Sequence, residues 1–165
     1  MSYVPGWLHH FLPLLLIMAA TAAVLLRLPR IDVGHSPSFR RRRAVNWVSL
    51  GATYAFLYMG RYNLTVAKNA LARWMSNEAF GTIFFWGTLT YGVAFALNGP
   101  LVDRLGGRRT ILMAAAGAAW MNVLLGALAW GIVHGRVPPH HLVPSFAGLF
   151  AANMYFQSFG AVSIV

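Results

Sequence analysis

Apolar residues fall into five long runs along the chain, separated by short polar stretches. The runs cover Trp7–Leu26, Ala44–Ala67, Ala79–Leu101, Thr110–Val133 and Val143–Val165. Each run is close to the roughly 20 residues that an α-helix needs to cross the hydrocarbon core of a bilayer. The pattern therefore predicts an all-α membrane protein with about five transmembrane helices.

The composition changes what the polar gaps mean. Hydrophobic residues make up 58% of the 165-residue chain and charged residues 10%, whereas a soluble domain carries about a quarter charged residues. The net charge is +10, and there is no cysteine to form a disulfide or a thiolate site. A basic soluble chain would suggest a nucleic-acid partner. Here the basic residues lie between apolar runs, which favours a lipid bilayer and no nucleic acid.

The basic residues also predict an orientation. Nine arginines fall on one side of the predicted arrangement: Arg27, Arg30, Arg40–Arg43, Arg104, Arg108 and Arg109. The opposite links contain Lys68, Arg73 and Arg136. Because basic loops stay in the cytoplasm, we expect a multi-pass protein of the inner (plasma) membrane with linker 27–43 and loop 102–109 inside. The first run is interpreted as a retained helix, with a cleaved signal peptide as the alternative.

The stretch from Asn98 to Arg109 packs one acid, three arginines and three glycines into a short link. We predict a tight turn between antiparallel helices, with Pro100 and Gly106-Gly107 marking the stop. Topology explains the arginines but not Asp103, because a carboxylate at a helix C-terminus is unfavourable unless it is paired. We therefore expect Asp103 to form an ion pair with an arginine of the turn or of a neighbouring helix.

One strong charge, Arg61, lies inside an apolar run. Tyr54, Tyr58 and Arg61 are spaced i, i+4, i+7, and Thr65 continues the same helical face. An arginine within a spanning helix is costly unless it faces protein or water. Its planar fork suits a carboxylate or a phosphate. Two interpretations remain at this point: Arg61 contributes to a substrate cavity, or it lies near the outer end of the helix and snorkels.

Catalytic patterns are missing from the sequence. There is no Ser/His/Asp arrangement, no phosphate-cradling loop after a strand and no helical HExxH motif. No Asp or Glu lies inside a run, so an intramembrane carboxylate relay is not predicted. The adjacent pairs His9-His10 and His140-His141 lack metal-ligand spacing on a helix. We expect a protein that is not an enzyme and that has no metal or cofactor.

The link between the third and fourth runs resembles the loop between helices two and three of the major facilitator superfamily, whose signature reads G-x-L-x-D-R-x-G-R-R/K. The matching positions are Gly99, Leu101, Asp103, Arg104, Gly107 (or Gly106), Arg108 and Arg109. The resemblance covers about residues 40 to 165. It implies that residues 44–165 are the first four core helices of a transporter domain and that this loop is a gating motif. Residues 1–43 would be an extra transmembrane helix with a basic linker.

Two further segments resemble the organophosphate:phosphate antiporter group of that superfamily. Leu57–Leu64 looks like its first core helix, which implies that Arg61 binds the anion. Gln157, in an F-Q-x-x-G segment, and Tyr91, in a Y-G segment, look like parts of the same site. With Tyr54 and Tyr58 they complete the predicted substrate-binding set.

Two positions depart from the patterns of related transporters. Phe95 stands where those antiporters carry a lysine, so one phosphate-facing cation is missing. Met154 stands where many proton-linked drug exporters carry an arginine. The first departure argues against a phosphorylated sugar as the substrate, and the second argues against drug:proton antiport.

The sequence thus predicts the N-terminal segment of a secondary active transporter. It would move a small anionic solute, organophosphate- or carboxylate-like, by alternating access together with the remaining C-terminal helices of the same transporter. Two alternatives stay open: a ligand sensor of transporter ancestry, and a small membrane scaffold subunit without transport.

Overall fold

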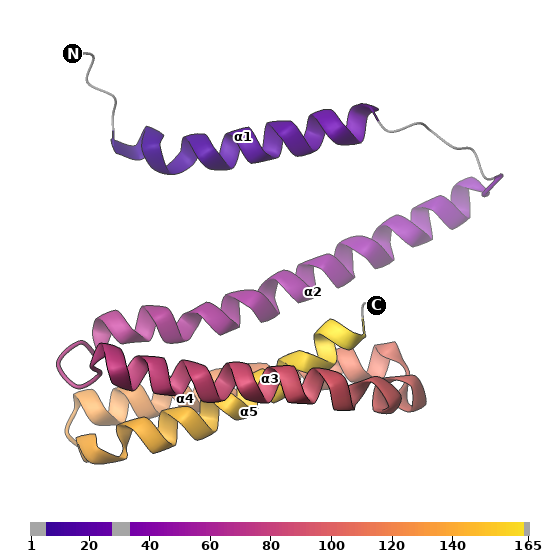
Figure 1. The fold of residues 1–165 in the computed structure, drawn as a ribbon. Helices are drawn as coiled ribbons and strands as arrows, with labels where there is room; N and C mark the ends of the chain where they lie inside the picture. The colour runs from indigo at the N-terminus through magenta and orange to yellow at the C-terminus, as the bar shows by residue number, and fades with distance from the viewer. Residues whose placement is uncertain (1–5, 28–33, 164–165) are drawn as a thin grey trace, which may run out of the picture. The chain divides into compact units, whose positions relative to one another are not determined.

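A computed structural model describes residues 6–27 and 34–163, and all regular structure within them is helical. The elements are α1 (Gly6–Arg27), α2 (Pro37–Ala70), α3 (Asn77–Leu105), α4 (Gly107–Val133), the short 3-10 helix η1 (Pro139–His141) and α5 (Leu142–Val162) (Figure 1). The all-helical prediction is confirmed for this part of the chain. Arg30, Asp32 and Val165 lie outside the described residues, as do the side chains of His9 and His10.

The chain divides into two compact units, residues 1–41 and 42–165. The first unit contains α1, in which Pro13 is inside the helix and Arg27 lies in the last turn. The second unit contains most of α2 and all the helices that follow it. The expected site residues from Tyr54 onwards all belong to this second unit.

Helix α2 begins earlier than the sequence pattern predicted. The polarity of the sequence predicts a linker over 27–43, but Arg40–Arg43 lie in the first turns of this helix. Ser36 accepts a hydrogen bond from the backbone N–H of Phe39 at 3.3 Å, as a helix N-cap does. Pro37 suits the first helical position, and arginine is a good helix former. Local capping and propensity therefore extend the helix through a stretch that polarity alone marked as a linker.

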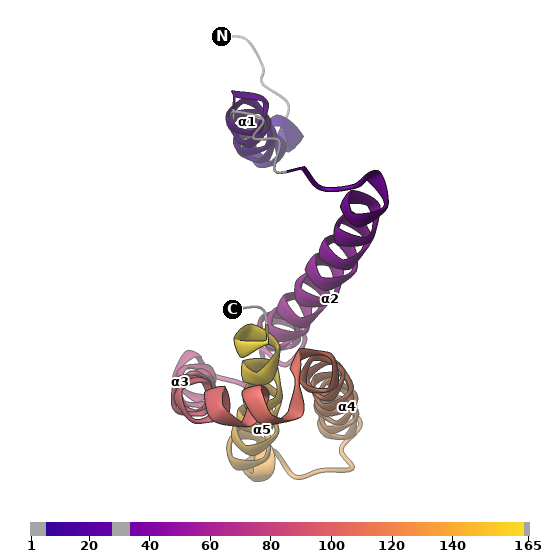
Figure 2. The same cartoon turned by 90° about the vertical axis from the view of Figure 1, so that its right-hand side faces the viewer.

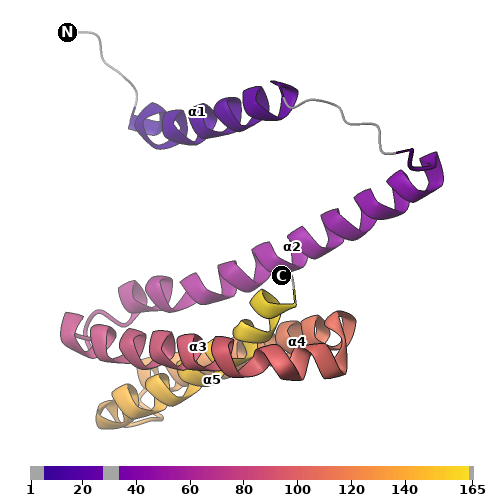
Figure 3. The ribbon, with the colours of Figure 1, turned by 45° about the vertical axis from the view of Figure 1, so that its right-hand side comes forward.

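Helix α5 is the centre of the second unit. It packs mainly against α3 and α4, which touch each other much less, and Figure 2 shows it between them. Phe146, Phe150 and Met154 of α5 are buried in the main apolar cluster. Helix α2 adds the buried residues Leu57 and Leu64, and it approaches the other helices toward its C-terminal end (Figures 1 and 3).

Two helices, α3 and α4, are long and apolar enough to span a membrane. In α1 a shorter apolar segment covers Phe11–Val24. Large apolar side chains on α3 and α4 are exposed: Phe85, Trp86, Leu97, Leu112, Trp120 and Val123. The buried polar residues include Asn98, Thr110, Asn153, Gln157 and Ser158. The core is mostly apolar and contains these buried amides and hydroxyls, while the two candidate spanning helices also expose large apolar side chains.

The link between α3 and α4 is shorter than predicted. Helix α3 continues through Asn98, Gly99 and Pro100 and ends at Leu105, and α4 begins at Gly107. The expected turn from Asn98 to Arg109 is therefore wrong in its extent, and Pro100 does not end the helix. A proline removes one backbone hydrogen bond. Asn98 and Val102 are buried on either side of it, and their packing keeps the helix intact.

The reversal between α3 and α4 depends on Gly106. Its φ of 81° and ψ of 145° lie near a region that only glycine adopts without strain. We expect Gly106→Ala to lower the free energy of unfolding by about 1–3 kcal/mol, measured by denaturant titration in mixed micelles. Gly126→Ala is the matched control, because an added Cβ there meets no atom within 4 Å. Equal stability of the two variants would contradict this explanation of the turn.

Candidate functional site

Arg61 of α2 is half-buried and is held by residues from three helices. Its Nε donates a hydrogen bond to Oε1 of Gln157 on α5 at 3.2 Å. Its guanidinium carbon lies 4.7 Å from the ring centroid of Tyr58 and 4.5 Å from that of Tyr91 on α3. Each cation–π contact is worth about 0.5–2 kcal/mol, so the guanidinium is oriented by its neighbours and does not extend along the helix as a snorkelling side chain would.

No carboxylate accompanies this guanidinium in residues 6–27 and 34–163. The contacts of Arg61 there are the Gln157 amide and the two tyrosine rings. A guanidinium has five N–H donors and no acceptor, and only the Nε donor is used by this set. The Nη edge therefore remains suited to a bidentate oxyanion.

The remaining residues of the expected site extend the same cluster. The Tyr54 hydroxyl donates to the Tyr58 hydroxyl at 3.1 Å, with the ring centroids 4.7 Å apart. On α3, the rings of Tyr91 and Phe95 are stacked at 6.3 Å. The structure thus brings together the five residues expected at the site: Tyr54, Tyr58, Arg61, Tyr91 and Gln157. Thr65, on the same predicted stripe, is exposed.

Three asparagines that the sequence analysis did not assign to the site continue it into the bundle. Asn153 Oδ1 accepts hydrogen bonds from Gln157 Nε2 at 3.2 Å and from Asn122 Nδ2 at 3.4 Å. Asn122 Oδ1 accepts from Asn63 Nδ2 at 3.0 Å. The sequence signal for these residues is an amide side chain inside an apolar run, where each amide needs a hydrogen-bond partner. Which of these amides bond to one another depends on how α2, α4 and α5 are rotated about their axes, and the sequence does not give that rotation.

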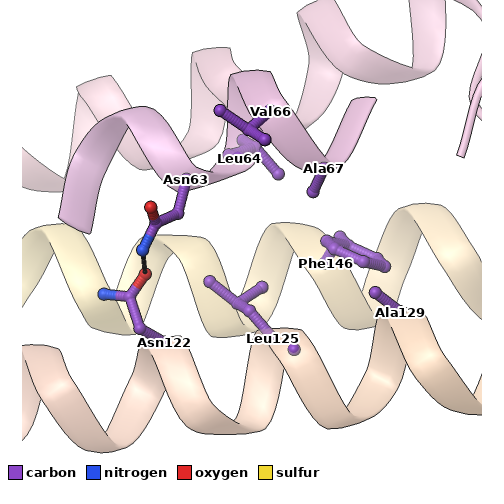
Figure 4. A pocket seen from close by; sticks show the side chains of 9 residues that line it. Asn63, Leu64, Val66, Ala67, Asn122, Leu125, Ala129 and Phe146 are labelled. Carbon is purple, nitrogen blue, oxygen red and sulfur yellow. Dashed lines mark hydrogen bonds between the residues drawn. The ribbon is translucent and has the colours of Figure 1, made fainter. Parts of the chain in front are cut away.

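A groove lies between α2 and α4 and contains two cavities of about 310 and 520 Å³. Asn63 and Asn122 contribute to both cavities, and Arg61 lines neither of them. Figure 4 shows the smaller cavity, with the bond between these asparagines at one side. The other labelled side chains are apolar: Leu64, Val66, Ala67, Leu125, Ala129 and Phe146. The lining of the smaller cavity is therefore mostly apolar, and its two asparagines are the polar groups in it.

The expected gating residues surround the α3–α4 turn. Asp103 and Arg104 lie in the last turn of α3, and Arg108 and Arg109 in the first turn of α4, all exposed. Gly99 is half-buried within α3, and Gly107 begins α4.

The predicted ion pair of Asp103 is wrong for this structure. Within the described part of the chain its carboxylate pairs with no arginine. Arg104 is the next residue on the helix, and neighbours at i, i+1 do not face each other. Arg108 and Arg109 belong to the next helix, beyond the reversal at Gly106. The turn therefore keeps an acid at a helix C-terminus and two arginines at an N-terminus, both unfavourable for the helix dipoles.

No metal site is formed by the residues that the structure describes, since no three His, Cys, Asp or Glu side chains lie together. Comparison of the chain with protein-family models, with curated proteins and with solved structures gives no match. The geometry around Arg61 and the sequence resemblance are therefore the observations that bear on function.

Proposed function

We propose that this chain is the N-terminal part of a secondary active transporter of the major facilitator type, which binds a small organic anion at Arg61. The observation that carries the proposal is the half-buried guanidinium, held by Gln157, Tyr58 and Tyr91. An arginine inside a spanning bundle is expected to face protein, water or an anionic ligand. The gating role of Gly99, Asp103, Arg104, Gly107, Arg108 and Arg109 belongs to the same proposal.

Insertion of the five α-helices in a membrane belongs to the proposal, and the side chains of α3 and α4 support it for these two helices. The outer faces of α3 and α4 expose Phe85, Trp86, Leu112 and Trp120, and lipid would cover them. Buried amides join neighbouring helices, as the Asn98–Ser158 bond at 2.8 Å does, and interhelical bonds of this kind help helices associate in a bilayer. With linker 27–43 and the 102–109 segment in the cytoplasm, the positive-inside rule is satisfied.

Charge balance favours a monocarboxylate over a phosphate ester. Within the described residues, Arg61 is the one cation of the cluster, and Phe95 occupies the position of the antiporter lysine, stacked on Tyr91. A phosphate group carries about −1.5 to −2 charges at pH 7. One guanidinium would leave part of that charge uncompensated. A carboxylate carries a single charge and matches the bidentate Nη edge.

Binding and flux measurements test the proposal. Radiolabelled benzoate is a suitable probe, because it has one carboxylate and an apolar ring. We expect saturable binding of benzoate to the 165-residue chain in lipid nanodiscs, and exchange of benzoate by the product of its gene in proteoliposomes. Binding without flux would indicate a sensor. Absence of saturable binding for benzoate and for phenyl phosphate would reject the anion site and leave the scaffold alternative.

The single-cation explanation predicts the effect of Phe95→Lys. A lysine beside Tyr91 would add a second positive charge to the cluster. We expect the affinity for phenyl phosphate to rise about tenfold relative to that for benzoate, since the dianion gains the larger Coulomb energy. Competition binding in nanodiscs measures the ratio. Phe95→Met removes the ring without adding charge, and a change of the ratio in this variant too would count against the explanation.

A further inference from the structure

A chain of hydrogen-bonded amides leads from Arg61 into the bundle. Gln157 accepts from Arg61 Nε through Oε1 and donates through Nε2 to Asn153 Oδ1, both at 3.2 Å. The same Asn153 oxygen accepts from Asn122 Nδ2 at 3.4 Å. Asn122 in turn accepts from Asn63 Nδ2 at 3.0 Å. Asn153 is thus the branch point between the charged cluster on one side and α4 on the other.

The directions of the two bonds that Gln157 makes follow from the chemistry of Arg61. A guanidinium has no acceptor, so the Gln157 amide must turn its oxygen toward Nε. Its NH₂ group then faces Asn153, which must present an oxygen, since two donors would otherwise oppose each other. That oxygen also suits Asn122 Nδ2. The orientation of Gln157 is therefore determined at both ends, by Arg61 and by Asn153.

This arrangement leaves Asn153 with an unsatisfied donor. The residue is completely buried, and its Nδ2 has no hydrogen-bond partner in the part of the chain that the structure describes. A buried donor without a partner destabilises the fold. An apolar side chain of similar size would avoid this loss. Packing therefore does not explain an amide at this position, whereas the two bonds that its oxygen accepts do.

We propose that Asn153 is the positioning residue of the Arg61 site. Its oxygen holds the Gln157 amide, which holds the Nε edge of Arg61 and directs the Nη edge toward the carboxylate of the ligand. Asn153 itself acts through Gln157 and does not touch the anion. The inference deepens the proposed function and rests on it for the ligand. The orientation of Arg61 can be measured without a ligand.

Hydrogen exchange of the Arg61 Nε–H, followed by NMR on the 165-residue chain in nanodiscs, tests the positioning directly. In Asn153→Leu, which removes the acceptor, we expect exchange to become about tenfold faster or more. Asn98→Leu is the matched control, because it removes another buried amide, bonded to Ser158, outside the chain of amides. Unchanged exchange in Asn153→Leu, or equal acceleration in the control, would overturn the proposal.

Asn153→Asp keeps the acceptor and tests the proposal even where the leucine variant fails to fold. We expect the Arg61 Nε–H to stay protected, and its exposure would overturn the proposal. The introduced carboxylate also places a competing negative charge near Arg61. Benzoate affinity should therefore be about tenfold lower in this variant than in the wild type.

The two proposals can fail separately. Benzoate affinity of Asn153→Asp equal to that of the wild type would contradict the positioning role. If the wild type binds no benzoate while Asn153→Leu still exposes the Arg61 Nε–H, the anion site is rejected and the positioning of Arg61 stands.

Discussion

Replacing Arg61 by glutamine is expected to abolish saturable benzoate binding, with a loss of affinity of at least about 30-fold. Removing one member of a buried, hydrogen-bonded charge pair costs about 2–5 kcal/mol, and each 1.4 kcal/mol is tenfold in affinity. Glutamine can still form hydrogen bonds, but it has no positive charge and lacks the pair of parallel N–H donors that binds a carboxylate in bidentate fashion. Arg61→Lys retains the charge without the bidentate edge and is expected to bind with intermediate affinity. Scintillation proximity binding in nanodiscs measures all three proteins.

Arg136→Gln is the matched control for this experiment. Arg136 also lies over an aromatic ring, with its guanidinium carbon 4.3 Å from the Trp130 centroid, but it is exposed and remote in sequence from the cluster. Its loss should leave benzoate affinity unchanged. If both glutamine variants bind benzoate as the wild type does, Arg61 has no role in anion binding. If both lose binding equally, the effect reflects net charge and not a site.

Gly87→Ala is expected to lower the free energy of unfolding by about 1–3 kcal/mol. A Cβ built at Gly87 would lie 2.3 Å from Cδ1 of Phe150 and 3.3 Å from Cγ of Met154. Both neighbours are buried in the core, where overpacking forces strained rotamers or a shift of α3 against α5. Because α5 carries Gln157 and α3 carries Tyr91, the same shift should also weaken benzoate binding. Unfolding in mixed micelles measures the stability.

Two further variants separate this clash from a general glycine effect. Gly92→Ala, on the same helix, adds a Cβ with no atom within 4 Å and should be neutral or slightly stabilising. Combining Gly87→Ala with Phe150→Leu should recover part of the loss, since contacting residues show coupling energies of about 0.5–3 kcal/mol. If the stability losses of the two single variants add exactly in the double variant, the clash with Phe150 is not the cause of the loss at position 87.

The sequence was most informative about the helices and least about their ends. The apolar runs predicted each helix, because burial or lipid exposure requires long apolar segments. The starts and stops depended on local chemistry that polarity does not report. The arginines of 40–43 continue a capped helix, and Pro100 lies within a helix that packing sustains. The reversal needs only Gly106, whose backbone angles are unusual.

The residues of the site that share one helix could be predicted from the sequence, and the contacts between helices could not. Tyr54, Tyr58 and Arg61 belong to one helix, so helical spacing alone placed them on one face. Tyr91 and Gln157 came from resemblance, and their contacts with Arg61 depend on how α3 and α5 are rotated. The Asp103 pairing failed because spacing does not give the direction of an exposed side chain.

By itself the sequence determined an all-helical chain with apolar segments long enough for a membrane and with one charged side chain among them. These properties follow from composition and from the period of the helix, and they need no knowledge of neighbours. Only the tertiary structure decided that Asn63, Asn122 and Asn153 join Gln157 and Arg61 in one directed chain of hydrogen bonds. A hydrogen bond requires its two atoms within about 3.5 Å, and that proximity is set by helix packing.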